Sequence, residues 1–305
     1  MSEKYKDYSE KLFNALQSND IDTLIKITTS EPLRERLKIN EKYLIVYGKN
    51  LIDDIKAFLK DDFKNLMLGL YTNKFEYDAK QIYKAIEGKE LDEDAIIELF
   101  VTRQGWMMPK IKKAYKDLYN IDLEKHIKDK TSGDFQNLLI YLLNSNRNEN
   151  DKIDKEKCKS ICTELNNTIK SNLGIVDQNF YKFICGCSSI ELMTVAREFH
   201  GEYKQTLEQV VEKIFPENIQ EIIKSIFLAN LCPSQYFAKR IYDALNKGEK
   251  FTNILNRIIV CRNEIDIDII KKYYNLQYSK EMIEDLKYKI DGDYEKLILA
   301  LINKN

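Results

Sequence analysis

The fold is decided by the stretch EYDAKQIYKAIEGKELDEDAIIELF (residues 76–100) and by its continuation to Leu143. Apolar residues recur three and four positions apart along this stretch, and short polar breaks separate the groups, which is the pattern of amphipathic helices. The breaks predict five short helices within about seventy residues. The last of them is capped by Ser132-Gly133-Asp134 and carries Phe135, Leu138, Leu139 and Leu142. These five helices form one structural unit.

The closing helix of this unit has counterparts along the whole chain. Four segments show the same order of an aromatic or isoleucine residue, two polar residues and two aliphatic residues: Phe63-Lys-Asn-Leu-Met, Phe135-Gln-Asn-Leu-Leu, Ile219-Gln-Glu-Ile-Ile and Tyr294-Glu-Lys-Leu-Ile. They recur at intervals of roughly 70 to 85 residues, which exceeds the period of about 33 to 47 residues in the common two-helix solenoids. The sequence therefore predicts an all-α chain of four five-helix repeats.

The boundaries of these repeats follow from changes in composition. We expect a loosely held head at residues 1–7, and repeats at 8–71, 72–143, 157–230 and 231–305. Residues 144–156 are rich in Asn, Asp and Lys and almost free of apolar side chains, which favours a linker between two halves of the chain. The third repeat diverges most from the others, but Thr206 and Gln209 have the spacing of a capping box at one of its helices.

Composition excludes several classes of protein. The formal net charge is -1 and 32% of the residues are charged, so the basic excess typical of a nucleic-acid-binding protein is missing. No apolar run reaches the roughly 20 residues of a membrane-spanning helix, and the charged N-terminus does not resemble a signal peptide. We therefore expect a cytoplasmic protein without a nucleic-acid partner.

Neither catalysis nor zinc binding is expected. His126 and His200 are the only two histidines, and no nucleophile–histidine–acid set or phosphate-binding loop can be assembled around them. The spacing of the six cysteines does not match a zinc knuckle, and in a reducing compartment they are expected to be buried thiols rather than disulfides. The cysteines are Cys158, Cys162, Cys185, Cys187, Cys232 and Cys261.

A five-helix repeat of this length that occurs four times resembles the annexin fold, and particular motifs support the resemblance over almost the whole chain. In the second repeat the matching residues are Asp78-Ala79, Gly88, Asp92-Glu93, Leu99, Thr102-Arg103, Tyr115 and Ser132-Gly133-Asp134-Phe135. In the fourth they are Arg262, Glu264-Ile265-Asp266, Ile269, Lys271, Tyr273 and Gly292-Asp293-Tyr294-Glu295-Lys296. The short head and the eroded motifs also resemble the α-giardins, a divergent annexin branch of flagellated protists.

The resemblance implies a curved disc of four repeats whose loops after the first and fourth helices lie on the convex face. It also implies calcium binding in those loops and, through calcium, binding of anionic phospholipid. In the family, a Gly-x-Gly-Thr loop supplies backbone carbonyls, and an Asp or Glu about forty residues later supplies a bidentate carboxylate. Lipid phosphate and water complete the six to eight oxygen ligands that Ca²⁺ prefers.

This sequence departs from the family pattern in every repeat. The carboxylate position falls on Phe58, Lys130, a residue near Ile214, and Lys289 in the four repeats, respectively. A lysine ammonium about 5 Å from Ca²⁺, at an effective dielectric constant of about 20, gives a repulsion of several kcal/mol. We therefore expect calcium to bind weakly or not at all. The candidate ligands of weak sites are Gly88, Glu90, Asp129, Gly174 and Glu212.

Lysines offer a partial substitute for the metal. Lys89 with Lys130, and Lys250 with Lys289, would place ammonium groups on paired convex loops, where each can add about 1 kcal/mol of affinity for an anionic membrane. We therefore expect a peripheral membrane protein that binds anionic phospholipid with weak or absent calcium dependence. The alternative is a helical scaffold that binds cytoskeletal or flagellar proteins and no lipid.

Two further features have structural interpretations. Arg103 and Arg262 follow the second helix of their repeats, where a guanidinium can serve helix-terminal carbonyl groups. The first and third repeats have no arginine at this point. The apolar run Trp106-Met107-Met108 is expected to pack between repeats, with Pro109 in the first turn of the next helix.

Overall fold

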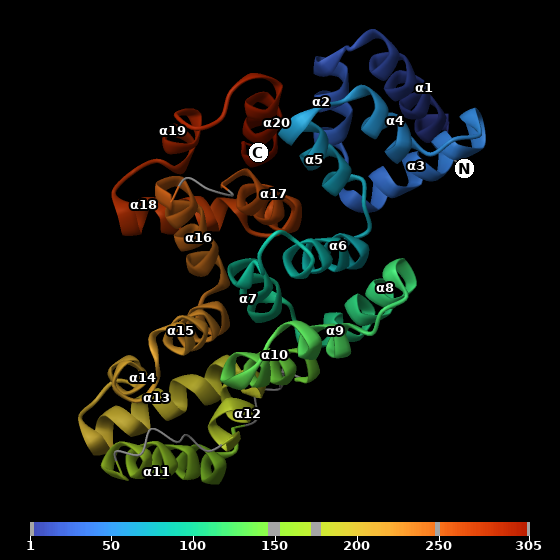
Figure 1. Cartoon of the computed structure of the whole chain (residues 1–305). Helices are drawn as coiled ribbons and strands as arrows, with labels where there is room; N and C mark the ends of the chain where they lie inside the picture. Colours follow the sequence, from blue (N-terminus) through green and yellow to red (C-terminus); the bar gives the residue numbers. More distant parts are fainter. Residues whose placement is uncertain (1–2, 146–152, 172–177, 248–250, 304–305) are drawn as a thin grey trace. The chain divides into compact units, whose positions relative to one another are not determined.

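The computed structural model describes residues 3–145, 153–171, 178–247 and 251–303. All regular secondary structure within these ranges is helical: twenty α-helices and one short 3₁₀ helix, η1 (Gly105–Met107). The expected all-α fold of four five-helix repeats is therefore confirmed (Figure 1). Among the described residues, no helix is long and apolar enough to cross a bilayer.

Each repeat contributes five consecutive α-helices. The first contains α1 (Glu3–Ser18), α2 (Ile21–Ser30), α3 (Leu33–Tyr47), α4 (Leu51–Phe58) and α5 (Asp61–Leu70). The second contains α6 (Lys74–Ile86), α7 (Glu93–Thr102), α8 (Met108–Tyr119), α9 (Leu123–Lys130) and α10 (Gly133–Asn144). The third contains α11 (Lys155–Ser171), α12 (Gln178–Gly186), α13 (Ser189–Tyr203), α14 (Leu207–Ile214) and α15 (Glu217–Leu231). The fourth contains α16 (Pro233–Lys247), α17 (Phe251–Arg262), α18 (Ile267–Tyr278), α19 (Met282–Lys287) and α20 (Gly292–Ile302).

The chain forms two compact units, one of residues 1–77 and 237–305 and the other of residues 78–236. In the first unit α5 packs on α17 and α2 packs on α20, so the two ends of the sequence share one core (Figure 1). In the second unit α7 packs on α15 and α10 on α12. Most of the expected linker at residues 144–156 lies outside the described residues, and the segments on both sides of it belong to the second unit.

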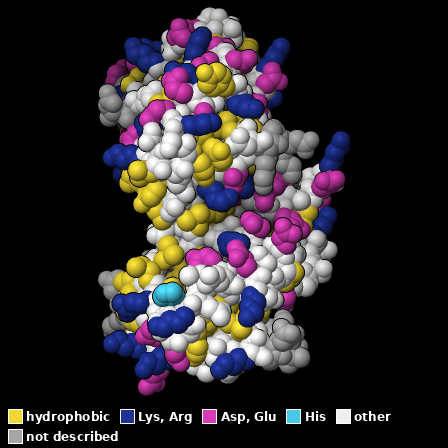
Figure 2. All heavy atoms as spheres, turned by 90° about the vertical axis from the view of Figure 1, so that its left-hand side faces the viewer, with side chains coloured by type: hydrophobic (Ala, Val, Ile, Leu, Met, Phe, Trp, Pro, Cys, Tyr) yellow, Lys and Arg dark blue, Asp and Glu magenta, His cyan; other side chains and the backbone are white. Residues whose placement is uncertain are grey.

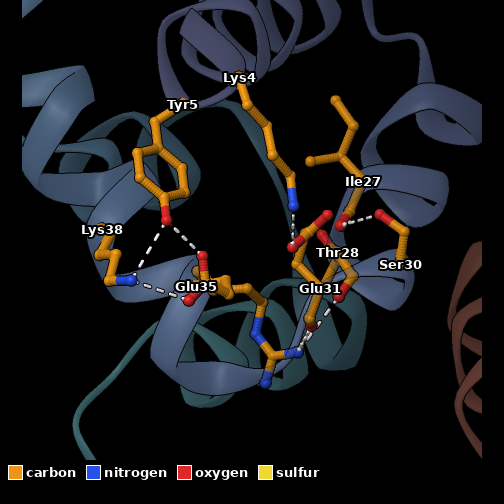
Figure 3. A network of polar contacts seen from close by, with 9 residues as sticks. Lys4, Tyr5, Ile27, Thr28, Ser30, Glu31, Glu35 and Lys38 are labelled. Atoms are coloured by element: carbon orange, nitrogen blue, oxygen red, sulfur yellow. Dashed lines mark hydrogen bonds and ion pairs between the residues drawn. The ribbon is translucent and has the colours of Figure 1, made fainter. Parts of the chain in front are cut away.

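The N-terminus also differs from expectation, because α1 begins at Glu3 rather than after a loosely held head of seven residues. Its first turn is tied to α2 and α3. Lys4 Nζ lies 2.9 Å from Glu31 Oε2, and the Tyr5 hydroxyl donates to Glu35 Oε2 at 2.5 Å (Figure 3). Glu35 also accepts from Lys38 at 2.9 Å. These contacts between segments about thirty residues apart hold the head in place, which sequence periodicity could not reveal.

Caps explain where several helices begin. The Asn50 side chain accepts from the Ile52 N–H at the start of α4, and Thr206 and Gln209 form the expected capping box of α14. Ser132 stands at the N-cap position of α10, but its side chain makes no capping hydrogen bond, contrary to expectation. Instead, the Gln136 side-chain amide donates to the Lys128 and Thr131 carbonyls at the end of α9.

One buried pair recurs in three repeats and defines equivalent positions. Tyr43, Tyr115 and Tyr274 on the third helices are fully buried. Each hydroxyl bonds to a side chain eleven residues later: Asp54, His126 Nδ1 (2.7 Å) and Asp285 (2.7 Å), respectively. In the third repeat the same pair is Phe199 and Val210, both buried and apolar. The hydroxyl and its partner are thus absent together, which avoids an unsatisfied polar group in the core.

Ion pairs of Arg103, which is buried, and Arg262, which is partly buried, connect consecutive helices within the two units. Arg103 donates through Nε and Nη2 to the two carboxylate oxygens of Asp78 at 2.7 and 2.6 Å, and both side chains are buried. Arg103 therefore has the predicted structural role, with the Asp78 carboxylate and, through Nη1, the Thr102 hydroxyl (2.8 Å) among its acceptors. Arg262 pairs with Asp266 Oδ1 at 2.7 Å and lies 4.9 Å from the centroid of the Phe237 ring.

The capping role predicted for those arginines belongs to Arg36, which sequence analysis did not single out. Arg36 is 1% exposed. It donates to the carbonyls of Leu70, Thr28 and Glu31 at 2.7, 3.2 and 2.6 Å, which serves the ends of α2 and α5. Of the run Trp106-Met107-Met108, which was expected to pack between repeats, Met108 is buried and Met107 partly buried, whereas the Trp106 side chain is 45% exposed.

The cysteines of the core are free thiols as expected. Four are buried, while Cys232 and Cys261 are partly exposed, and none of the six forms a disulfide. Burial raises the pKa of the Cys162 thiol to about 12, so it stays protonated at neutral pH. Among the described residues, no three His, Cys, Asp or Glu side chains are grouped closely enough to hold a metal ion.

Candidate convex-loop site

The candidate site of each repeat is expected between the loop after the first helix and the end of the fourth helix, and the structure shows a contact between these two elements in the second repeat. The recurring buried pair identifies equivalent residues in this region. The residues four positions after Asp54, His126, Val210 and Asp285 are Phe58, Lys130, Ile214 and Lys289. All four lie at or just beyond the end of a fourth helix, and none has a carboxylate.

In the second repeat a chain of hydrogen bonds connects the loop to α9. Lys130 Nζ lies 2.7 Å from Glu87 Oε1 in the α6–α7 loop. The same oxygen lies 2.8 Å from Nε2 of His126, whose Nδ1 faces the hydroxyl of Tyr115 at 2.7 Å. Lys130 first, and His126 second, hold the pKa of the Glu87 carboxyl below its usual range. An ammonium group thus ties the loop to the fourth helix.

Sequence analysis missed Glu87 and gave His126 no role. The available signal was the eleven-residue spacing that His126 shares with Asp54 and Asp285, because it identifies a polar position under a buried tyrosine. Glu87 had no comparable signal, since one acidic residue beside a loop glycine is common. Only the folded chain brings it to the end of α9.

Backbone carbonyls do converge in this loop. A Cβ at Gly88 would lie 3.1 Å from the Lys84 carbonyl oxygen and 3.2 Å from the Glu90 carbonyl oxygen, so only glycine fits without a shift. A hard cation favours such oxygens. Lys130, however, stands where the family pattern has a carboxylate, and its ammonium is bound to Glu87 of this loop. The residues of the second repeat therefore do not fit a high-affinity calcium site.

The other candidate ligands of the second repeat lie at the surface. Glu90 and Asp129 are both exposed, and neither has an ion-pair partner among the described residues. Lys89 is exposed in the same loop and is likewise unpaired within the described part of the chain. The structure thus brings Lys89 and Lys130 to one loop region, but only Lys130 is bound to an acidic group.

The loop after the first helix of the first repeat is too short to direct several backbone carbonyls at one point. Only two residues separate α1 from α2, and Asn19 takes a left-handed conformation with φ of 54°. The Asp20 carboxylate accepts from both the backbone N–H and the hydroxyl of Thr23, at 3.1 and 2.7 Å, which lowers its pKa. Its oxygens thus cap α2, and the opposing position holds the Phe58 ring. This loop does not fit calcium either.

In the third repeat the candidate acid is already paired. Glu212 Oε1 lies 2.8 Å from Lys224 Nζ, and this hydrogen bond is the main cause of a raised Lys224 pKa. Gly174, the other candidate there, lies outside the described residues.

In the fourth repeat, Lys250 also lies outside the described residues. Lys289 is exposed, and no acidic side chain pairs with it within the described ranges.

Comparison with known proteins identifies the family of this chain. The family model for Annexin matches residues 7–70, 77–142 and 236–301. The chain belongs to the annexin family. These three ranges lie in the first, second and fourth repeats, where the motifs are strongest. Annexins in general bind anionic phospholipid membranes and have no catalytic activity.

Individual annexins agree along nearly the full length. Annexin A13 of Homo sapiens is 29% identical over 280 residues, which cover 92% of this chain and 89% of the relative. The solved structure of annexin III superposes with a TM-score of 0.94 at 28% identity, covering 99% of this chain and 94% of that one. Calcium-bound alpha-14 giardin superposes with a TM-score of 0.83, covering 98% and 100%, but at 19% identity this likeness is one of fold alone.

Lys130 can be tested as the group that excludes calcium from the second annexin repeat. Lys130→Glu is expected to create a calcium site with a dissociation constant of about 10⁻⁴ to 10⁻³ M, because a ligand replaces a repelling ammonium beside the loop carbonyls. Calorimetric titration measures the binding, and 1 mM calcium should raise the melting temperature of this variant only.

The matched control is Lys125→Glu, which makes the same charge change in the first turn of α9. It is expected to behave as the unmodified protein does. Equal calcium binding by the unmodified protein and Lys130→Glu would contradict the role assigned to Lys130.

Proposed function

We propose that this annexin binds anionic phospholipid membranes peripherally, from the cytoplasmic side, with weak or no dependence on calcium. Family membership supports the membrane partner. The observation that carries the loss of calcium dependence is that the second-repeat loop is already tied to α9 by Lys130 and Glu87 at 2.7 Å. A metal ion is not needed to hold these elements together.

Two of the lysines predicted to contact lipid are exposed and can meet lipid phosphate. Lys89 and Lys289 are unpaired within the described part of the chain, whereas Lys130 shares its charge with Glu87. An ammonium near an anionic bilayer adds about 1 kcal/mol, and salt screens the attraction within about 10 Å at 0.1 M. On the face drawn in Figure 2, basic and acidic side chains are interspersed, so attraction depends on local groups rather than on a large basic surface.

Co-sedimentation with vesicles of phosphatidylserine and phosphatidylcholine tests this function. We expect the protein to pellet in chelator at low salt and to be released at high salt. The variant Lys89→Glu/Lys289→Glu should bind at least tenfold more weakly, because it removes about 2 kcal/mol of attraction and adds repulsion. The matched control Lys272→Glu/Lys125→Glu changes as many charges at exposed sites away from these loop positions and should bind normally.

The other outcomes are equally informative. Pelleting only with calcium would overturn the proposed loss of metal dependence. The absence of pelleting under every condition would favour the alternative, a helical scaffold for cytoskeletal or flagellar proteins. Capture of a filament protein by the full chain would then be the next measurement.

A further inference from the structure

The fourth helices of the first and fourth repeats end in exposed aromatic side chains. Tyr288 directly follows α19 and is 85% exposed, and Phe58 is the last residue of α4 and is 40% exposed. Both repeats belong to the same compact unit. At the positions that the recurring pair aligns with Tyr288, α9 and α14 in the other unit carry Asp129 and Lys213; at the positions aligned with Phe58 they carry Lys130 and Ile214.

The fold imposes the exposure of both rings. Tyr288 stands between Leu286, fully buried, and Ile290, 6% exposed. The backbone N–H groups of Lys289 and Ile290 both donate to the Leu286 carbonyl, at 2.8 and 3.1 Å, which closes a tight turn. Phe58 is followed by Leu59, which is 4% exposed and donates its N–H to Ile55 at 3.0 Å. Buried neighbours thus fix a backbone from which each ring projects into solvent.

A cation without an acidic partner accompanies each ring. Lys289 follows Tyr288, and Lys60 lies two residues after Phe58; both are exposed and unpaired among the described residues. Three acidic residues within five positions of Tyr288 in the sequence are engaged elsewhere, whereas Asp291 is exposed. Glu284 pairs with Lys287 at 2.9 Å, Asp285 accepts from a buried tyrosine, and Asp293 pairs with Lys296 at 3.1 Å.

We propose that Tyr288 and Phe58 insert into the interfacial layer of an anionic bilayer, with Lys289 and Lys60 on neighbouring headgroup phosphates. This inference rests on the function proposed above. Tyrosine suits the interface because its ring is apolar and its hydroxyl can stay hydrated, while phenylalanine gains by leaving water. In this chain, aromatic burial at the first and fourth repeats supplies affinity that a bridging metal would otherwise provide.

A tryptophan probe tests insertion directly. Trp106 is the single tryptophan, so Trp106→Phe/Tyr288→Trp carries one reporter at the turn. With phosphatidylserine vesicles in chelator at low salt, its emission should shift to shorter wavelength and be quenched by brominated acyl chains. The control Trp106→Phe/Leu276→Trp places the reporter on α18 at a side chain that is 75% exposed, and its emission should not change.

The affinity of serine variants for vesicles is the second measurement of aromatic insertion. Tyr288→Ser and Phe58→Ser should each weaken vesicle binding about tenfold, as expected when a buried aromatic contact is lost. Leu276→Ser removes an apolar side chain that is 75% exposed and should bind normally. Circular dichroism melting of every variant verifies that the fold is retained.

The outcomes separate the two proposals. If the unmodified protein does not bind vesicles, the proposed function is wrong and the inference falls with it. If the unmodified protein binds, but the serine variants bind equally well and the reporter at the turn is not quenched, only the inference is overturned. Quenching of the α18 reporter to the same extent would also contradict insertion through these turns.

Discussion

Replacing Arg36 with methionine is expected to lower the free energy of unfolding by about 3 to 5 kcal/mol. The guanidinium is buried and donates to three main-chain carbonyls. Its Nη2 also lies 2.9 Å from Glu264 Oε1, which additionally accepts from the Leu33 N–H. Methionine has a similar unbranched stem but no donors. It would therefore leave buried carbonyls unsatisfied, and each such group costs about 1 to 3 kcal/mol.

Urea denaturation followed by circular dichroism measures this loss. The matched control is Arg34→Met, at an exposed site two residues earlier on α3, with an expected change within about 0.5 kcal/mol. Because Glu264 and Arg36 join the first and fourth repeats of one compact unit, the loss should be visible in probes placed in either repeat. A loss below about 1 kcal/mol for Arg36→Met would show that water or relaxed neighbours satisfy the freed carbonyls.

Arg103→Met is expected to have a comparable effect on the other compact unit. Arg103 and Asp78 are 6% and 2% exposed, and their two parallel hydrogen bonds are 2.6 and 2.7 Å long. Removing one partner leaves a buried charge without its counterion, which typically costs about 3 to 5 kcal/mol. Arg103→Lys should lower the free energy of unfolding less, because lysine keeps the positive charge. It should still be less stable than the unmodified protein, because lysine cannot make both parallel hydrogen bonds.

A double-mutant cycle identifies the origin of this loss. Arg103→Met/Asp78→Asn should be more stable than the sum of its single changes predicts, since the second change neutralises the stranded carboxylate. Arg197→Met, at an exposed arginine of the same unit, is the control and should change stability by less than about 0.5 kcal/mol. Strict additivity would contradict a direct ion pair between Arg103 and Asp78.

The buried tyrosines show why local sequence predicted so much of this fold. Their helices appear as stripes of apolar residues spaced three and four apart, a pattern that depends only on helical geometry. The eleven-residue separation between each tyrosine and its partner is also local, since it connects consecutive helices of one repeat. The same locality made the positions of Lys130 and Lys289 predictable from repeat spacing alone.

The contacts of Arg36, Glu87 and Glu264 could not be predicted in this way. Arg36 and Glu264 are 228 residues apart, and Glu87 is 39 residues from His126. Nothing in a periodic pattern selects such partners, because helix periodicity identifies the buried face but not the helix that covers it. Composition likewise did not indicate the two compact units, because helix–helix contacts between distant segments define them.

The amino-acid sequence by itself determined the helical class and the four repeats, and it has no carboxylate at the four positions that the annexin resemblance assigns to the calcium-binding acid. These properties follow from short-range spacing and residue chemistry. Tertiary structure alone decided that Lys130 is bound to Glu87, that Tyr288 and Phe58 project from fixed turns, and that the first and fourth repeats share a core. Each of these depends on burial or on contact between distant segments, and packing of the whole chain determines both.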